Sequence, residues 1–198
     1  VAGNFSTSGG TATFTTTANA TITGNISGTG AITMGSGTLT AGASWTNNGT
    51  FTARTGTVNY NGSSQTIAPL TYNNLTISQS GGNASLAADA TVNGILNLSS
   101  GNLAVTDPYA LTMGGSATTI GAKDVTGIVK RTSLVAGTEY TFGNQYTTII
   151  FRNVGTLPTD VSVKISIGSA PVWKTGAIQR TYDIIQNGAS GSFATINL

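Results

Sequence analysis

Apolar and polar side chains alternate with a period of two along most of the chain, in short runs separated by turn residues. In the runs 20–23, 38–41 and 57–60, apolar side chains alternate with Thr or Asn, as in a strand that is buried on one face. Asn48-Gly49 and Asn93-Gly94 supply left-handed turn positions between such runs. Because no helical period occurs, the pattern predicts an all-β fold.

Two architectures fit the pattern of residues 1–120: an antiparallel sandwich, and a parallel β-helix in which roughly 20 residues make one coil. The very short runs, the Gly- and Asn-rich turns and the degenerate repeats favour a right-handed parallel β-helix (a β-solenoid) of about five or six coils. Its inward row is expected to be Ile22, Ile32, Leu39, Phe51, Val58, Ile67, Leu75, Ile77, Val92, Leu96, Leu98, Leu103, Val105 and Leu111.

Residues 121–198 have longer alternating runs. The clearest is 161–167, with Val161, Val163, Ile165 and Ile167 on one face. Such runs predict a small Ig-like β-sandwich that is one strand short of a complete unit. The expected strands are 127–134, 139–143, 147–153, 161–167, 177–185 and 192–198.

Charged side chains make up only 7% of the chain, and they are unevenly distributed. Three of them, Arg54, Asp89 and Asp107, lie in residues 1–120, and the other eleven lie in 121–198. We therefore expect a domain boundary near residue 121, with a β-helix repeat domain at 1–120 and the sandwich at 121–198.

The net charge of +2 comes from cations that are spread along the chain, with Lys130-Arg131 as the one adjacent pair. Nucleic-acid binding needs clustered Lys and Arg, so we expect no nucleic-acid partner. The longest apolar runs are about four residues, whereas a membrane-spanning helix needs about 18. The sequence therefore predicts no membrane span.

The first half contains the segments Trp45-Thr-Asn-Asn-Gly-Thr-Phe-Thr-Ala53, Gly56–Gly62, Gln65–Ile67, Tyr72–Ile77 and Val92–Leu103. These segments resemble the recurring units of large secreted bacterial parallel β-helix proteins, which are often adhesin-like surface proteins. Segments 127–143 and 177–184 are similar to the sandwich that commonly follows in that family. The resemblance covers about residues 44–198 and implies an extracellular or cell-surface location.

Because the chain begins at Val1 without Met and stops inside an apparent strand, we also expect processing or trimming at both ends.

The sequence offers little material for catalysis. It contains no His and no Cys, which excludes the usual general base, the commonest metal ligand and thiolate chemistry. In the first 120 residues the only carboxylates are Asp89 and Asp107, eighteen residues apart. We therefore predict that the protein is not an enzyme and uses no cofactor or metal.

Two surface chemistries remain open. Trp45, Tyr60, Tyr72, Trp173 and Tyr182 could stack on sugars, although packing in a β core is the commoner role of such residues. The first half also contains eight Asn-x-Ser/Thr sequons, which are either glycosylation sites or a consequence of abundant Asn and Thr. These are Asn4, Asn19, Asn25, Asn48, Asn61, Asn74, Asn83 and Asn97.

Thr-x-Thr pairs also suggest ice binding. The pairs start at positions 21, 38, 50 and 55, and these irregular intervals favour ordinary strand propensity instead.

The ends of a β-helix expose sheet edges and a cross-section of the core, which invite further strands. Residues 1–23 carry no charge that would discourage this, and 11–17 read as an uncovered strand. We therefore predict a structural subunit of an extracellular filament or cell-surface assembly, which binds copies of itself through open edges or strand donation. The alternative is an adhesin or stalk module that binds glycans or surfaces. The residues expected to mediate self-association are Thr11, Thr13, Phe14, Thr15, Phe193, Ile196 and Leu198.

Overall fold

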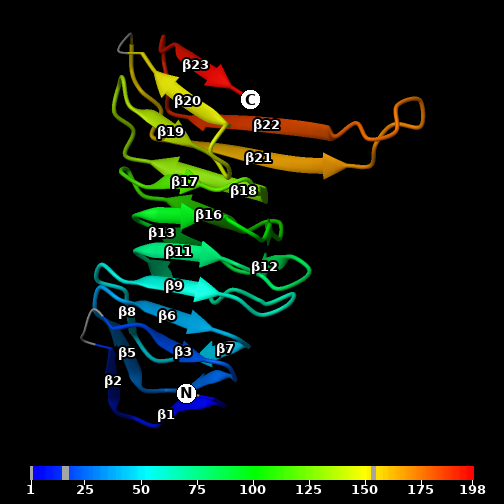
Figure 1. Cartoon of the computed structure of the whole chain (residues 1–198). Helices are drawn as coiled ribbons and strands as arrows, with labels where there is room; N and C mark the ends of the chain where they lie inside the picture. Colours follow the sequence, from blue (N-terminus) through cyan, green and yellow to red (C-terminus); the bar gives the residue numbers. More distant parts are fainter. Residues whose placement is uncertain (1, 15–17, 153–154) are drawn as a thin grey trace.

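The computed structural model describes residues 2–14, 18–152 and 155–198. Within these residues the chain forms 23 strands and no helix, and it winds into a β-solenoid of about seven turns (Figure 1). The coils stack from the N-terminal end to the C-terminal end, so the two chain ends lie at opposite ends of the stack. This confirms the predicted all-β solenoid, whereas its right-handed sense stays a prediction.

The first face of the solenoid contains two parallel sheets that follow one another along the stack, with β8 in contact with β10. Their strands are β2 (Thr11–Phe14), β5 (Ala31–Met34) and β8 (Phe51–Thr52), then β10 (Thr71–Tyr72), β13 (Ala90–Val92), β16 (Ala110–Met113) and β18 (Val125–Thr132).

The second face is a single parallel sheet. It contains β3 (Ala20–Ile22), β6 (Thr38–Ala41), β9 (Thr57–Tyr60), β11 (Asn74–Ile77), β14 (Ile95–Asn97) and β17 (Thr118–Ile120). The third face begins with β1 (Phe5–Thr7), β4 (Ile26–Gly28) and β7 (Trp45–Asn47), and continues with β12 (Ala84–Leu86) and β15 (Leu103–Val105), which pairs with the start of β18.

The alternation of apolar and polar side chains along these short strands forms the core. Parallel pairing places inward side chains of successive coils above one another, as in the row Leu39, Val58, Leu75 and Leu96. All fourteen residues of the predicted inward row are buried except Phe51, which is half-buried and packs against the core. The period-two pattern therefore identified the core correctly.

Close contact between coils requires glycine at some corners. At Gly28 the backbone has a φ of +112°, and a Cβ atom there would lie 1.8 Å from the carbonyl oxygen of Thr7 in the coil below. Beside this corner, Asn47 is buried and its Nδ2 donates to Thr7 Oγ1 at 2.6 Å and to the Gly30 carbonyl at 3.1 Å. At this corner glycine allows the coils to approach closely, and side-chain hydrogen bonds replace the ladder bonds that strands provide on the faces.

Residues after β18 change the pairing direction but stay in contact with the solenoid. The strands β21 (Asp160–Gly168) and β22 (Gln179–Asn187) add antiparallel to β18 and extend the first face. A second antiparallel sheet, formed by β19 (Glu139–Thr141), β20 (Thr148–Phe151) and β23 (Ala194–Asn197), lies beyond β17 on the second face.

All six strands predicted in this half are present, except that Asn153 lies outside the described residues. The structure does not confirm a separate trailing β-sandwich, because β18, β21 and β22 belong to the same sheet as β10, β13 and β16. The domain boundary at residue 121 stays a prediction. Among the described residues, no helix is long and apolar enough to cross a membrane.

The side chains of the adjacent cations Lys130 and Arg131 lie on opposite sides of the sheet, because successive strand residues face opposite sides. Lys130 points outward, whereas Arg131 is fully buried at the end of the core. The Arg131 guanidinium donates to the carbonyl oxygens of Gly114 and Thr141, both at 2.8 Å, and lies 5.4 Å from the centre of the Tyr140 ring. Burial lowers the pKa of Arg131 to about 10.

Candidate functional site

The C-terminal end of the solenoid contains an open, mostly apolar cleft. It lies between the β18–β21–β22 sheet and the β19–β20–β23 sheet and has a volume of about 240 Å³. Ile149, Phe151 and Val161 form its buried floor. Two of the lining side chains at its mouth, Phe193 and Ile196, are 65% and 45% exposed. Since the inward side chains of β22 and β23 are the last layer of the core, this end presents apolar surface to solvent.

Both strands that border the cleft have an open edge. Within the part of the chain that the structure describes, β22 pairs with β21 alone and β23 with β20 alone. An open edge exposes a row of backbone N–H and C=O groups that can accept another strand. The cleft therefore combines apolar surface with two sets of free backbone hydrogen-bonding groups.

The two open edges lie at the same level of the stack. Among the residues that the structure describes, the first face contains nine strands in order, namely β2, β5, β8, β10, β13, β16, β18, β21 and β22. The second face, counted in the same way, also contains nine, namely β3, β6, β9, β11, β14, β17, β19, β20 and β23. Because β21 is antiparallel to both β18 and β22, the edge strand β22 again runs in the direction of the solenoid strands.

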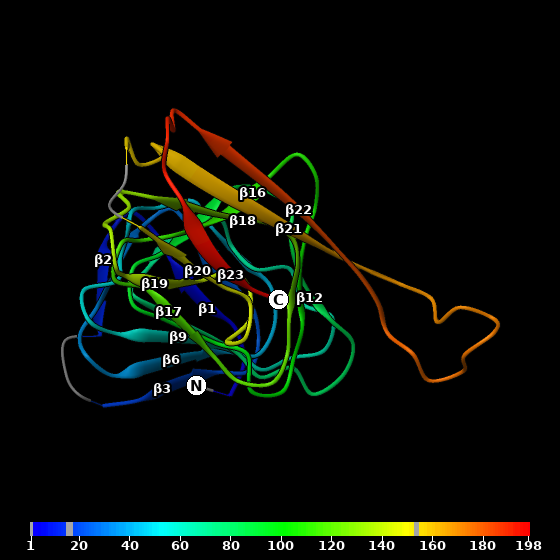
Figure 2. The ribbon, with the colours of Figure 1, turned by 90° about the horizontal axis from the view of Figure 1, so that it is seen from above.

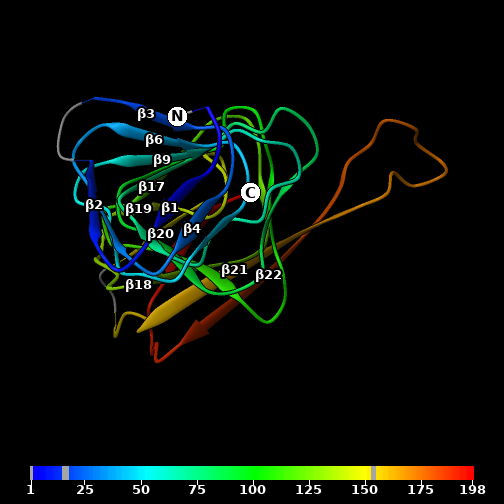
Figure 3. The same ribbon diagram turned by 90° about the horizontal axis from the view of Figure 1, so that it is seen from below.

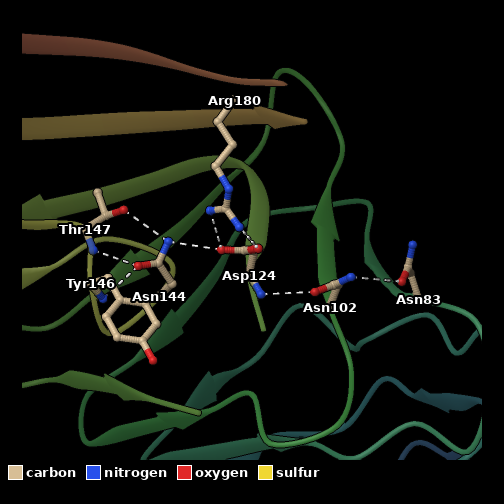
Figure 4. A network of polar contacts seen from close by, with 7 residues as sticks. All are labelled: Asn83, Asn102, Asp124, Asn144, Tyr146, Thr147 and Arg180. Atoms are coloured by element: carbon tan, nitrogen blue, oxygen red, sulfur yellow. Dashed lines mark hydrogen bonds and ion pairs between the residues drawn. The ribbon is translucent and has the colours of Figure 1, made fainter. Parts of the chain in front are cut away.

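A polar network ties β22 to the last coil (Figure 4). The carboxylate of Asp124, whose side chain is 11% exposed, accepts two hydrogen bonds from the Arg180 guanidinium at 2.9 and 2.7 Å. Asn144 Nδ2 donates to the same carboxylate at 3.1 Å, and Asn102 Oδ1 accepts from the Asp124 backbone N–H at 3.0 Å. Hydrogen bonding to Asp124 raises the pKa of Arg180. The network is fully explained as an anchor for the base of the β21–β22 hairpin.

Beyond this anchor the β21–β22 hairpin projects away from the solenoid (Figures 2 and 3). Its tip exposes Val172, Trp173 and Ile178 at 100%, 80% and 68%. Exposed apolar side chains of this size are typical of contact surfaces. Trp173 therefore does not pack in the core of this chain, whereas Trp45, Tyr60 and Tyr72 are buried and Tyr182 is half-buried.

The residues predicted to mediate self-association lie at the two ends of the stack. Phe193, Ile196 and Leu198 are exposed at the C-terminal end. Thr11 and Thr13 are exposed on β2 at the N-terminal end. Phe14 is half-buried there, with its ring 5.7 Å from that of Phe5. Thr15 and the rest of the predicted strand after Phe14 lie outside the described residues. The structure thus brings these residues into two sets, one at each end.

The sequon asparagines lie at corners or on the outward faces of the strands. Six of the eight are exposed, and Asn74 and Asn97 are half-buried. Some of their side-chain oxygens join successive coils: Asn4 Oδ1 accepts from the Asn25 N–H at 2.9 Å, and Asn74 Oδ1 from the Ile95 N–H at 2.9 Å. This coil-to-coil bonding gives abundant Asn a structural role, and glycosylation stays a prediction.

The described residues contain no group of three or more His, Cys, Asp or Glu side chains that could hold a metal ion. The most strongly perturbed acids are buried tyrosines rather than residues in a cleft. Tyr60 and Tyr72 are buried with their hydroxyl oxygens 2.9 Å apart, and burial raises the pKa of Tyr60 to about 12 and that of Tyr72 well above its usual value. Tyr72 donates to the Ala68 carbonyl and Tyr60 accepts from the Ala68 N–H, so both hydroxyls are structural.

Comparison with known proteins gives no relative: no protein-family model, no curated protein and no solved structure matches this chain.

Proposed function

We propose that the protein is a structural subunit of an extracellular filament or cell-surface assembly, in which copies associate end to end through their sheet edges. The observation that carries this proposal is the apolar cleft between the open edges of β22 and β23. The extracellular location rests on the resemblance of the sequence to secreted β-helix proteins.

A second copy stacked in the same orientation has suitable strands for both edges. Its β2 and β3 begin the two faces that β22 and β23 end. Its β2 would pair with β22 in parallel, because β22 has regained the direction of the solenoid strands. Phe5 and Phe14 of the second copy would cover the apolar mouth of the cleft. Such a contact joins two different surfaces, so it propagates into a fibre instead of closing as a dimer.

Sedimentation velocity of the purified chain over a range of concentrations tests this proposal. We expect the parent protein to form species that grow with concentration, and Ile196→Asp to sediment as a monomer, because a charge at the cleft mouth would be buried without a partner. Ile120→Asp is the matched control: Ile120 is 42% exposed on the side of the solenoid, against 45% for Ile196. Ile120→Asp should associate like the parent. A parent chain that remains monomeric, or an Ile196→Asp variant that associates normally, would overturn the proposal.

Glycan binding by an adhesin or stalk is a second candidate function. A polar groove on the outward side of the first face favours it, and its geometry is developed below.

A further inference from the structure

Six of the fourteen charged side chains of this protein line one groove. Two adjoining cavities, of about 610 and 730 Å³, lie on the outward side of the first face and share Pro108, Ile128 and Ser162. Asp89, Asp107, Asp160 and Asp183 line them, which is four of the six acidic residues of the chain. Lys130 and Lys164 also line them. With four carboxylates and two ammonium groups, the groove has a formal net charge of −2.

The floor of this groove is a row of hydrogen-bonding side chains that crosses the strands. Register places Thr71, Thr91 and Thr112 side by side on β10, β13 and β16, and then Lys130 on β18 and Ser162 on β21. Neighbouring strands are about 4.8 Å apart, so the row from β10 to β21 spans about 19 Å. The groove is thus elongated along the solenoid axis, and each strand from β10 to β21 adds a polar group, whereas Ile185 continues the row on β22.

Both lysines are already paired with carboxylates inside the groove. Lys130 Nζ lies 3.5 Å from Asp160 Oδ1, and Lys164 Nζ forms an ion pair with Asp107. Asp89 and Asp183 are exposed and leave the excess negative charge. Paired carboxylates and ammonium groups present acceptors and donors together, which suits the hydroxyl groups of a sugar. The negative excess opposes a polyanion.

Pro108 lines both cavities, and the neighbouring Tyr109 is 38% exposed. Tyr182 also borders one cavity, but it pairs with the buried Ile165 and its side chain packs against the core. An exposed aromatic ring with an apolar face and a polar tip, such as that of Tyr109, is suited to pack against a sugar ring.

A peptide fits this groove less well. The central strands β13, β16, β18 and β21 are each paired on both sides, so they offer no open backbone edge to an added strand. We propose that this groove binds a linear, uncharged glycan that lies across the strands, along the solenoid axis. The inference goes beyond end-to-end association, because the groove lies on the outer side of the sheet whereas the cleft opens between two sheets.

Biolayer interferometry with immobilised linear oligosaccharides tests the groove. The probes are neutral β-glucan, mannan and galactan oligosaccharides, an acidic galacturonan oligosaccharide and an oligolysine peptide. We expect the parent to bind at least one neutral oligosaccharide. Thr112→Val and Asp183→Asn should each weaken this binding about tenfold, because the first removes a hydroxyl group from the groove and the second replaces a charged acceptor oxygen with an NH2 donor.

Thr40→Val is the matched control, since Thr40 is an outward strand residue on the second face. It should bind like the parent, and so should Ile196→Asp, which alters only the cleft. The proposal is overturned if no neutral oligosaccharide binds, if only galacturonan or oligolysine binds, or if neither groove variant weakens binding. Thr112→Val and Asp183→Asn should leave end-to-end association unchanged, so the two proposals can fail separately.

Discussion

The buried pair Tyr60 and Tyr72 gives a quantitative test of how the solenoid interior is held together. Tyr60 donates to Tyr72 at 2.9 Å, Tyr72 donates to the Ala68 carbonyl at 2.6 Å, and the Ala68 N–H donates to Tyr60 at 3.2 Å. Tyr72→Phe removes one of the two donors to the Ala68 carbonyl, which also accepts from the Leu70 N–H at 2.9 Å, and leaves the Tyr60 O–H without its acceptor. Tyr60→Phe leaves the Ala68 N–H without its acceptor. An unpaired buried polar group costs about 1–3 kcal/mol, so each variant should lose that much free energy of unfolding.

The double variant should lose less than the sum of the two, because the Tyr60–Tyr72 bond is counted in both single variants. We expect a coupling free energy of about 1 kcal/mol from a double-mutant cycle measured by urea unfolding at pH 7. Tyr146→Phe, at a tyrosine that is 65% exposed, is the control and should unfold like the parent.

Alkaline pH tests the same pair independently. Burial raises the pKa of Tyr60 to about 12, against about 10 in the unfolded chain. Above pH 10 the unfolded state therefore binds fewer protons than the folded state, and stability falls by up to about 1.4 kcal/mol per pH unit, or about 2 kcal/mol in all by pH 12, from this residue alone. Tyr60→Phe should lose this part of the alkaline decline. Single variants that match the parent at pH 7 and keep its full alkaline decline would refute the reasoning.

Two further predictions concern the anchor of the hairpin and the corners of the coils. Arg180→Ala leaves the Asp124 carboxylate without its ion-pair partner. We therefore expect the local stability of β22 to fall by about 2 kcal/mol and its amide hydrogen exchange to become about 30-fold faster. Arg152→Ala, at an exposed residue, is the control and should change little. Equal exchange in both variants would contradict the anchoring role. Gly28→Ala should prevent folding of the first coils or lower the free energy of unfolding by more than about 3 kcal/mol in thermal unfolding, because the added Cβ atom would overlap Thr7. At Gly10 an added Cβ atom would have no neighbour within 4 Å, so Gly10→Ala should be tolerated.

The period-two pattern was sufficient to predict the fold class and the core, because inward and outward positions are set locally along each strand. It could not predict which strands become neighbours. The strand at 161–167 was identified correctly, but its pairing with β18 depends on register between distant segments. For that reason the sequence suggested a separate sandwich where the structure extends the solenoid sheet.

The same limit applies to side chains on the surface. The Thr-x-Thr pairs are irregularly spaced in the sequence because they belong to different faces of the coil. On the first face, outward threonines recur every 19 to 21 residues, as Thr13, Thr33 and Thr52 and again as Thr71, Thr91 and Thr112. Asp89 and Asp183 are 94 positions apart in the sequence, yet they line adjoining cavities. No local pattern could signal that groove, and nothing in the sequence signalled the exposure of Trp173.

The axial repeat of the assembled protein tests the central claim of end-to-end stacking most directly. Both faces contain nine strands, so a continuous stack with strands about 4.8 Å apart should repeat every 43 Å or so, that is, about nine strand spacings. Negative-stain images of concentrated protein should therefore contain filaments one solenoid wide with an axial repeat of about 43 Å, and Ile196→Asp should abolish them. Isolated particles at every concentration, or filaments with an unrelated repeat that persist in Ile196→Asp, would contradict the account.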